Sequence, residues 1–325
     1  MTYQRKEKIQ VALIGLGQIG CRYDLGKESH VLTHARAISE NDSFDLVAAV
    51  EILSAYGDEF KKHYSVPVFS SIHEMLRVFE PELIVIATPT STHVEVLEQV
   101  LSSPKLKVVL CEKPISEGAH QATKIVKLFQ DRKVDLFLNY QRRSTKSTNE
   151  LKHLISNKQF GTFLGGSAFY TGGYLNSASH LVDVLEWLFG TTTAPAKLNS
   201  LAKMESDFKV SASLKLMGKD FYLQQIDTDS FSIFEAQLLF DKFRVRYLDG
   251  GNRIFIDDLQ PNKIYSGEYN YEMSESPKFK TEGDDLMEVY KDLLKHLQGQ
   301  SCNLLSGVDA VSLVTRMYSI AEIRV

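Results

Sequence analysis

The sequence has few cysteines and no long apolar run, and both absences narrow what the protein can be. Its three cysteines, Cys21, Cys111 and Cys302, form no even-numbered disulfide framework and show no metal-ligand spacing. We therefore expect a reduced, cytoplasmic setting and no metal site. No apolar stretch approaches the roughly 18 residues that span a bilayer, and the charged N-terminus does not resemble an export signal. We expect no membrane partner.

The chain also lacks a strong charge of either sign. Its formal net charge is −4, and basic pairs such as Arg142-Arg143 are isolated. A nucleic-acid-binding protein would have a strongly basic stripe, so no nucleic-acid partner is expected. The 325 residues, 43% of them hydrophobic, are enough for two domains with separate cores.

A glycine fingerprint near the N-terminus is the most informative feature that is present. An apolar run over 9–14 leads directly into Gly15-Leu-Gly17-Gln-Ile-Gly20. A buried strand that turns tightly into a helix directs backbone N–H groups and the positive end of the helix dipole at one spot, where a pyrophosphate can bind. A glycine-rich turn without a ligand is the alternative. The residues predicted to bind a dinucleotide here are Gly15, Gly17, Gln18, Ile19 and Gly20.

Glu51 ends a second short apolar run and is the predicted ligand of the adenosine ribose. It lies further from Gly20 than the usual spacing, which indicates an insertion at 23–30. A carboxylate here repels a 2′-phosphate, and no arginine follows, so NAD is favoured over NADP. The alternative is a solvated residue at a strand end.

Strand and helix patterns alternate through the first 140 residues, which predicts a doubly wound parallel sheet. Strands are expected at 9–14, 45–50, 66–69, 83–88, 107–111 and 134–138, with helices at 31–38, 94–101 and 119–129. We therefore assign residues 1–140 to an NAD-binding Rossmann domain.

After residue 140 the pattern becomes rich in β-strands. Strands are expected at 162–170, 208–216, 221–226, 231–240 and 243–248, and closing helices at 284–297 and 308–323. Residues 141–325 are predicted to form a second, α+β domain built on a large, mostly antiparallel sheet.

Three further places carry residues suited to chemistry. Glu112-Lys113-Pro114 follows the fifth strand, where ligands bind in open α/β sheets, so Lys113 could bond the reacting oxygen of a substrate. An ordinary loop lysine is the alternative.

Thr88, Pro89 and Thr90 follow the fourth strand and suit a turn over the cofactor. His93 either joins them or simply starts a helix.

The third place is the segment from Gly172 to Asp183, in which a Gly-Gly turn leads into a helix. His180 can exchange a proton with an alcohol, and Asn176 shares its helix face if the helix begins early enough. A structural histidine near a helix start, with Asp183 complementing the dipole, is the alternative. Residues predicted to line the substrate side are Tyr140, Arg142, Arg143, Tyr174 and Asn176, although core packing accounts equally well for the tyrosines.

In this combination of motifs the chain resembles the Gfo/Idh/MocA family, which includes glucose-fructose oxidoreductases and inositol dehydrogenases. The motifs are Gly15 to Gly20, Glu51, Ala87-Thr-Pro-Thr, Glu112-Lys-Pro114, Asn139 to Arg143, and Gly172-Gly through His180 and Asp183. The resemblance implies reversible, NAD(P)-dependent oxidation of a sugar or polyol hydroxyl. It also implies that Lys113 is catalytic, that His180 is the acid/base, and that Glu112 and Pro114 shape the turn near the nicotinamide. For residues 141–325 it implies a substrate-binding domain whose open sheet covers the active site and forms homodimer or homotetramer contacts.

Asn176 departs from the family pattern, in which many relatives carry an aspartate four residues before the histidine. An amide cannot accept a proton in turnover, but it can hold a substrate hydroxyl, and an asparagine here resembles members that act on nucleotide-linked sugars. The predicted function is hydride transfer at a hydroxyl carbon of a sugar, polyol or nucleotide-linked sugar. A non-catalytic dinucleotide sensor or accessory protein is the main alternative, and an S-adenosylmethionine-dependent methyltransferase a weaker one.

Overall fold

The computed structural model describes residues 7–27, 30–191, 193–204, 207–281, 283 and 285–322. By their contacts, the described residues up to Gln141 and those from Gly283 to Ser312 form one compact unit. The remaining described residues form a second unit. The sequence-based division at residue 140 assigned 283–312 to the C-terminal domain, whereas the described residues of this stretch group with the first unit.

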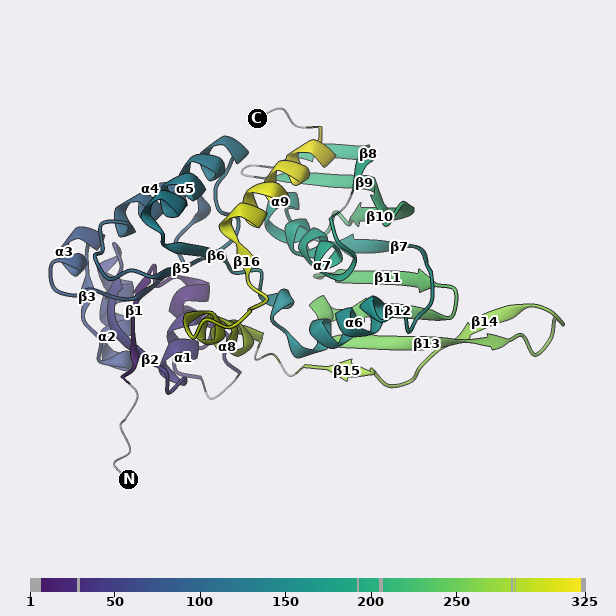
Figure 1. Cartoon of the computed structure of the whole chain (residues 1–325), viewed down its shortest axis with the longest axis horizontal. Coiled ribbons are helices and arrows are strands. Elements are labelled where there is room, and N and C mark those ends of the chain that lie inside the picture. The colour runs from purple at the N-terminus through teal and green to yellow at the C-terminus, as the bar shows by residue number, and fades with distance from the viewer. Residues whose placement is uncertain are drawn as a thin grey trace, which may run out of the picture. The chain divides into compact units, whose positions relative to one another are not determined.

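The first unit contains the predicted doubly wound sheet (Figure 1). Within the described residues the strand order is β16-β6-β5-β4-β1-β2-β3, and every pair is parallel except β16 with β6. Near-continuous runs of Val, Ile and Leu form its central strands, as expected for a sheet that is buried on both faces. The strands are β1 (Ile9–Ile14), β2 (Phe44–Val50), β3 (Val68–Phe69), β4 (Leu83–Ile86), β5 (Val108–Cys111), β6 (Asp135–Leu138) and β16 (Leu305–Ser306).

Helices connect these strands, and the first connection is irregular. A single turn of π-helix over Gln18–Arg22 follows Gly17 and contains Gly20, and α1 begins only at His34. The buried Asp24 carboxylate accepts hydrogen bonds from the backbone N–H groups of Leu32 and Thr33, which ties Asp24, within the predicted insertion, to the start of α1. The helices of this unit are α1 (His34–Ser39), α2 (Ser54–Tyr64), α3 (Ile72–Leu76), α4 (His93–Val100), α5 (Ala119–Arg132) and α8 (Asp285–Leu297).

The second unit contains the predicted, mostly antiparallel sheet. Its main path over the described residues is β14-β13-β12-β11-β7-β10-β9-β8, with β15 beside β13, and only β7 and β10 run parallel. The strands are β7 (Phe163–Tyr170), β8 (Thr193–Lys203), β9 (Phe208–Leu216), β10 (Lys219–Gln225), β11 (Phe234–Phe240), β12 (Phe243–Leu248), β13 (Arg253–Pro261), β14 (Tyr269–Glu272) and β15 (Phe279–Lys280).

Alternating burial along β9, β11 and β12 shows that one face of this sheet is covered. The helices α6 (Lys146–Ser156) and α7 (Ser179–Phe189) lie with this sheet in Figure 1 and contact each other. The division between the units falls within α9 (Gly307–Ile320).

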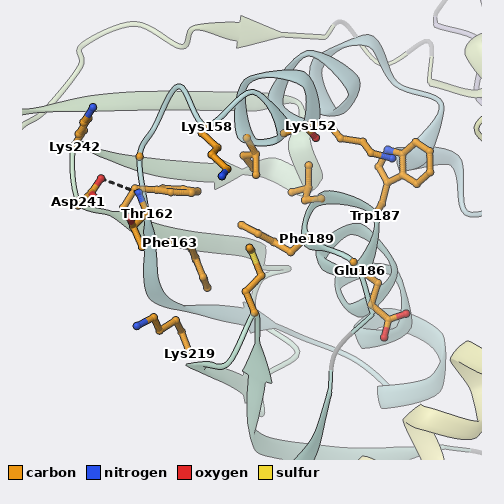
Figure 2. Close-up of a pocket in the computed structure, with 17 residues that line it drawn as sticks. Lys152, Lys158, Thr162, Phe163, Glu186, Trp187, Phe189, Lys219, Asp241 and Lys242 are labelled. Carbon is orange, nitrogen blue, oxygen red and sulfur yellow. Dashed lines mark hydrogen bonds between the residues drawn. The ribbon is translucent and has the colours of Figure 1, made fainter.

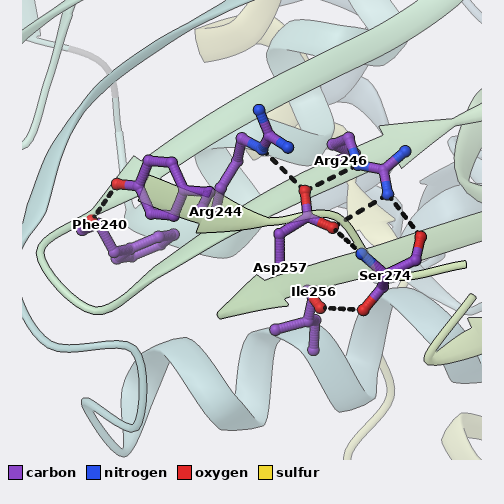
Figure 3. A network of polar contacts seen from close by, with 7 residues as sticks. Phe240, Arg244, Arg246, Ile256, Asp257 and Ser274 are labelled. Carbon is purple, nitrogen blue, oxygen red and sulfur yellow. Dashed lines mark hydrogen bonds and ion pairs between the residues drawn. The ribbon is translucent and has the colours of Figure 1, made fainter. Parts of the chain in front are cut away.

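Sequence patterns missed β8, β13, β14, β15 and β16. Several of these are two- to four-residue strands, too short for periodicity to be read. In β13 a buried Asp257 interrupts the apolar pattern. Figure 3 shows why a carboxylate is tolerated there: Arg244 and Arg246 both donate to Asp257, at 2.7 and 2.8 Å, and the Ser274 N–H donates at 2.9 Å. Burial alone would raise the pKa of Asp257, but these donors outweigh it and hold the pKa below its usual value.

Candidate functional site

The three glycines of the fingerprint occupy three different environments. Gly15 has φ +91°, and a Cβ there would lie 2.7 Å from the Ala87 carbonyl oxygen. A Cβ at Gly20 would clash with the Gly15 carbonyl oxygen, so close packing requires glycine. A Cβ at Gly17 would meet nothing within 4 Å. Gly17 therefore faces open space, as a glycine that lets a ligand approach the backbone would.

Glu51 lies at the carboxyl end of β2 and is bound to the glycine-rich turn. Its Oε2 accepts from the Leu16 N–H at 2.8 Å, and its Oε1 accepts from the Leu53 N–H at 2.9 Å. Each carboxylate oxygen has a second lone pair, so both can still accept a hydrogen bond from a ligand hydroxyl. The bonds fix the carboxylate beside the turn.

A cavity of about 440 Å³ opens at the carboxyl ends of β1 to β4. Five predicted cofactor residues line it: Gly15, Gly17, Glu51, Thr88 and Pro89. It also has lining residues that the sequence analysis missed, namely Ile52, Leu53, Tyr56, Ser70, Ser71, Ile72, Thr92, Glu95, Val96 and Gln99. The missed lining residues that come after β2 and β3 stand at the carboxyl ends of these strands. That position in the sequence is the signal that could have identified them. The site fits a ligand with an apolar, aromatic part and a hydroxyl-bearing part.

The predicted residues Gln18, Ile19, Gly20 and Thr90 do not line this cavity. His93 does not line it either, and its side chain is fully buried. Its ring nitrogens lie 2.8 and 2.9 Å from the carbonyl oxygens of Pro114 and Thr88, so His93 links the turn after β4 to the turn after β5. Burial lowers the pKa of His93.

Glu112, at the end of β5, is held by residues far away in the sequence. Its Oε1 accepts from Asn139 Nδ2 at 2.6 Å and from His34 Nε2 at 3.0 Å. His34 Nδ1 lies 2.9 Å from the hydroxyl of Tyr290 on α8. A carboxylate can only accept, so the His34 proton is on Nε2, and Nδ1 accepts from Tyr290 when the ring is neutral.

This network keeps Glu112 charged. Burial by itself raises the pKa of a carboxyl, but the bonds from His34 and Asn139, with Lys113 nearby, bring the pKa of Glu112 below its usual value. Lys113 and Pro114 follow directly, are partly exposed and are joined by a cis peptide bond. The sequence analysis did not foresee the roles of His34 and Tyr290, since 256 residues separate them.

In the second unit, Asn176 and His180 lie on one continuous helical segment. A turn of π-helix over Tyr174–Ala178 leads into α7. The Asp207 carboxylate accepts from the backbone N–H groups of Leu175 and Asn176 at 2.8 and 2.9 Å. A Cβ at Gly173 would clash with this carboxylate, which explains the second glycine of the pair. Asn176 is exposed and His180 half-buried.

Asp183 is fully buried one turn further along α7. Its Oδ1 accepts from Arg143 Nε at 2.7 Å. Burial raises the pKa of Asp183 to about 7, and Arg143 offsets only part of that effect. Arg142 instead donates to the Gly250 carbonyl oxygen and lies over the Phe234 ring. Both arginines therefore have partners inside this unit.

The two tyrosines predicted on the substrate side are buried. Tyr174 is inaccessible, and its hydroxyl donates to the Met317 carbonyl oxygen at 3.0 Å. Tyr140, in the first unit, is also buried. Both environments fit core packing, which is the alternative that the sequence left open. No described helix is long and apolar enough to cross a membrane.

Comparison with known proteins shows which family this geometry resembles. Residues 9–140 match the family model GFO_IDH_MocA, described as an oxidoreductase family with an NAD-binding Rossmann fold. Inositol 2-dehydrogenase of Rhizobium meliloti (strain 1021) is 26% identical over 153 residues, which cover 47% of this chain and 42% of that protein. The chain spans about half the length of the curated relatives it matches.

Two solved structures share the fold along nearly the whole chain. The WlbA dehydrogenase from Bordetella pertussis, in complex with NADH and UDP-GlcNAcA, has a TM-score of 0.75 at 21% identity and covers 97% of each chain. A super-repressor mutant of Gal80p from Saccharomyces cerevisiae has a TM-score of 0.76 at 15% identity, again covering 97% of each chain. Residues 9–140 of this chain therefore match the NAD-binding Rossmann domain of the Gfo/Idh/MocA oxidoreductase family, and the solved structures share the fold of the remaining part.

Proposed function

We propose that this protein is an NAD(H)-dependent dehydrogenase or reductase that acts on a hydroxyl carbon of a sugar, polyol or nucleotide-linked sugar. One observation carries the proposal: the first unit combines an open cavity on the glycine-rich turn with a lysine-bearing turn at the neighbouring strand end. A nicotinamide dinucleotide supplies hydride transfer when bound. The cofactor would contact Gly15 to Gly20, Glu51 and the turn at Thr88 to Thr90.

NAD is preferred over NADP in this proposal because Glu51 occupies the ribose position and Ile52 follows it. Arg22 lies over the ring of Tyr56, which lines this cavity, 4.1 Å from the ring centroid, and is already paired with Glu59. A 2′-phosphate would have to displace that pair and lie beside Glu51. We expect NADH to bind at least tenfold more tightly than NADPH.

Lys113 and His180 divide the chemistry at the substrate oxygen. His180 takes the proton from the hydroxyl during oxidation and returns it during reduction, and Lys113 stabilises the charge that develops on oxygen. Glu112 and Pro114 hold the turn that carries Lys113, and His93 braces it against the turn after β4. Asn176 is proposed to hold a substrate hydroxyl.

The relatives guide the choice of substrate class. Inositol 2-dehydrogenase names a polyol, and the WlbA complex contains a nucleotide-linked sugar acid. We therefore propose to screen free sugars, polyols and uridine- or thymidine-linked sugars while following NADH absorbance. We also propose that the protein is cytoplasmic and forms a homodimer or homotetramer through the second sheet. Light scattering would measure the size of the oligomer.

Two variants test the catalytic assignment. Lys113→Met and His180→Asn should each lower kcat/KM by about 10²- to 10⁴-fold, the usual effect of removing a placed acid or base. Lys124→Met and His120→Asn, which lie on the exposed side of α5, are matched controls that should keep full activity. Normal turnover in both test variants would refute the assignment. Tight NADH binding without turnover of any screened sugar would favour the non-catalytic sensor, a class that Asn176 also supports.

A further inference from the structure

A second cavity, of about 980 Å³, lies within the second unit at the carboxyl end of α7 (Figure 2). It is bounded by the end of α6, the start of β7, the β9–β10 hairpin and the β11–β12 hairpin. His180 does not line it and lies near the opposite end of α7, six residues before Glu186, which is about 9 Å along the helix axis at 1.5 Å per residue. The cavity is therefore separate from the residue that we assign to proton transfer.

The floor of this cavity is apolar and partly aromatic. Phe163, Leu188 and Phe240 are buried beneath it, and Phe189 and Trp187 are half-buried at its side. A pocket of this volume, with such a lining, is of the size that holds a small organic ligand.

The rim carries four lysines: Lys152, Lys158, Lys219 and Lys242. Among the described residues no carboxylate pairs with Lys158, Lys219 or Lys242. The two carboxylates of the lining are both engaged, Glu186 with the Arg316 guanidinium and Asp241 with the Thr162 N–H. In Figure 2 Lys158 points toward the labelled aromatic residues. The cavity thus places excess positive charge over an apolar floor.

Lys152 adds to this charge in an unusual setting. Its Nζ lies 2.8 Å from the centroid of the Trp187 ring, and Arg143 lies 5.0 Å from the same centroid. Burial, the larger cause, and the nearby positive charge of Arg143, the smaller one, lower the pKa of Lys152 to about 8. A bound anion would relieve the repulsion between these two cations.

Met217, at the mouth of the cavity, lies in a strained position. The two-residue loop Met217-Gly218 joins β9 to β10, and both residues have positive φ, +50° and +76°. Asn-Gly is the favoured pair for such a turn, because a side chain like that of Met is disfavoured at positive φ. Met217 is also 61% exposed. A strained backbone and an exposed apolar side chain do not stabilise the fold. Their combination beside a cavity therefore indicates that Met217 contacts a ligand.

We propose that this cavity binds an amphipathic carboxylate, with the anionic head among the rim lysines and the apolar body against Phe163, Phe189 and Met217. The excess of ammonium groups selects the charge of the head, and the aromatic floor selects an apolar body. This proposal does not depend on the proposed dehydrogenase activity.

The only tryptophan of the chain, Trp187, lines the cavity and reports on binding directly. The full-length protein without NADH is titrated with decanoate while Trp187 emission is followed. We expect a saturable change in emission with decanoate, at least tenfold weaker binding of 1-decanol and none of acetate. No change with decanoate, or equal responses to decanoate and 1-decanol, would overturn the proposal.

Three variants test the residues involved. Lys158→Ala combined with Lys219→Ala should weaken decanoate binding at least fivefold, whereas Lys278→Ala, an exposed lysine outside the cavity, should not. Met217→Asn suits the turn, so it should raise the midpoint of thermal unfolding and yet weaken decanoate binding. Unchanged affinity in all of these variants would reject the site. An emission change on raising protein concentration alone would show instead that a second copy covers the cavity, which also rejects it.

Discussion

Gly17 differs from the other glycines of its turn because its α-carbon faces open space. Gly15 and Gly20 are required by the fold itself, through a positive φ and a close backbone approach. The backbone at Gly17 suits any residue, with φ −69°. We therefore propose that position 17 is glycine because a ligand approaches its backbone.

Gly17→Ala should separate folding from cofactor binding. We expect a thermal midpoint within about 2 °C of the wild type, and an NADH dissociation constant raised at least tenfold because the added methyl group occupies the space of the phosphates. Calorimetry and NADH titration measure the two effects. Gly15→Ala serves as the contrast and should be clearly destabilised. Wild-type affinity in Gly17→Ala would place the pyrophosphate elsewhere.

Asp183 should make the free energy of unfolding depend on pH. Its pKa is near 4 when unfolded and about 7 when folded. The folded chain therefore binds more protons between these values, so the free energy of unfolding falls as pH rises through this window. Relative to Asp183→Asn, which does not titrate, the wild type should lose at most about 4 kcal/mol between pH 4 and pH 8. Urea unfolding of both proteins at several pH values tests this, and parallel pH profiles would contradict it.

At the scale of elements, α1 and α8 join to support the turn after β5. His34 on α1 and Tyr290 on α8 are both buried, and their hydrogen bonds lead to Glu112, next to Lys113. Tyr290 also packs edge-on against Phe44 of β2. The two helices thus fix the orientation of the Glu112 carboxylate, although Glu112 lies on neither of them.

Breaking this chain of hydrogen bonds should affect both stability and turnover. Tyr290→Phe should cost about 1 kcal/mol of unfolding free energy, and His34→Leu about 2 to 3 kcal/mol, because the Glu112 carboxylate then keeps only its hydrogen bond from Asn139. The double variant should cost less than the sum, since both changes remove the same bond. We expect kcat to fall in both single variants with little change in NADH affinity. Tyr222→Phe, at an exposed position of β10, is the control. Strictly additive effects would argue against a connected network.

At the scale of the whole molecule, the first unit is not built from one continuous stretch. Its core contains Leu286, Val289, Tyr290 and Leu293 of α8 together with residues of the N-terminal strands. Burying four such side chains contributes about 1.5 to 3 kcal/mol each, which is comparable to the whole stability of a domain.

A fragment ending at Gln141 should therefore fail to fold cooperatively. We expect it to lack a sharp thermal transition and to bind no NADH. In the full chain, Leu293→Ala should lower the unfolding free energy by about 2 to 5 kcal/mol without preventing folding. Circular dichroism melts compare the two. A fragment with a native-like melt would show that α8 is dispensable.

The sequence by itself determined the features that depend on neighbouring residues. The run into Gly15, the alternation of strands and helices, and the change of pattern near residue 140 are local signals, because backbone conformation and side-chain periodicity are local properties. They predicted the Rossmann sheet, the second sheet and the position of Glu51 at a strand end. The family resemblance was confirmed through residues 9–140.

Only the tertiary structure decided which distant residues serve these motifs. Asp207 caps the turn at Asn176, His34 and Tyr290 hold Glu112, and α8 completes the first core. The roles assigned to Lys113 and His180 stay predictions. Hydrogen bonds and buried contacts between remote residues leave no periodic pattern in the chain, because their geometry exists only once the elements have packed together.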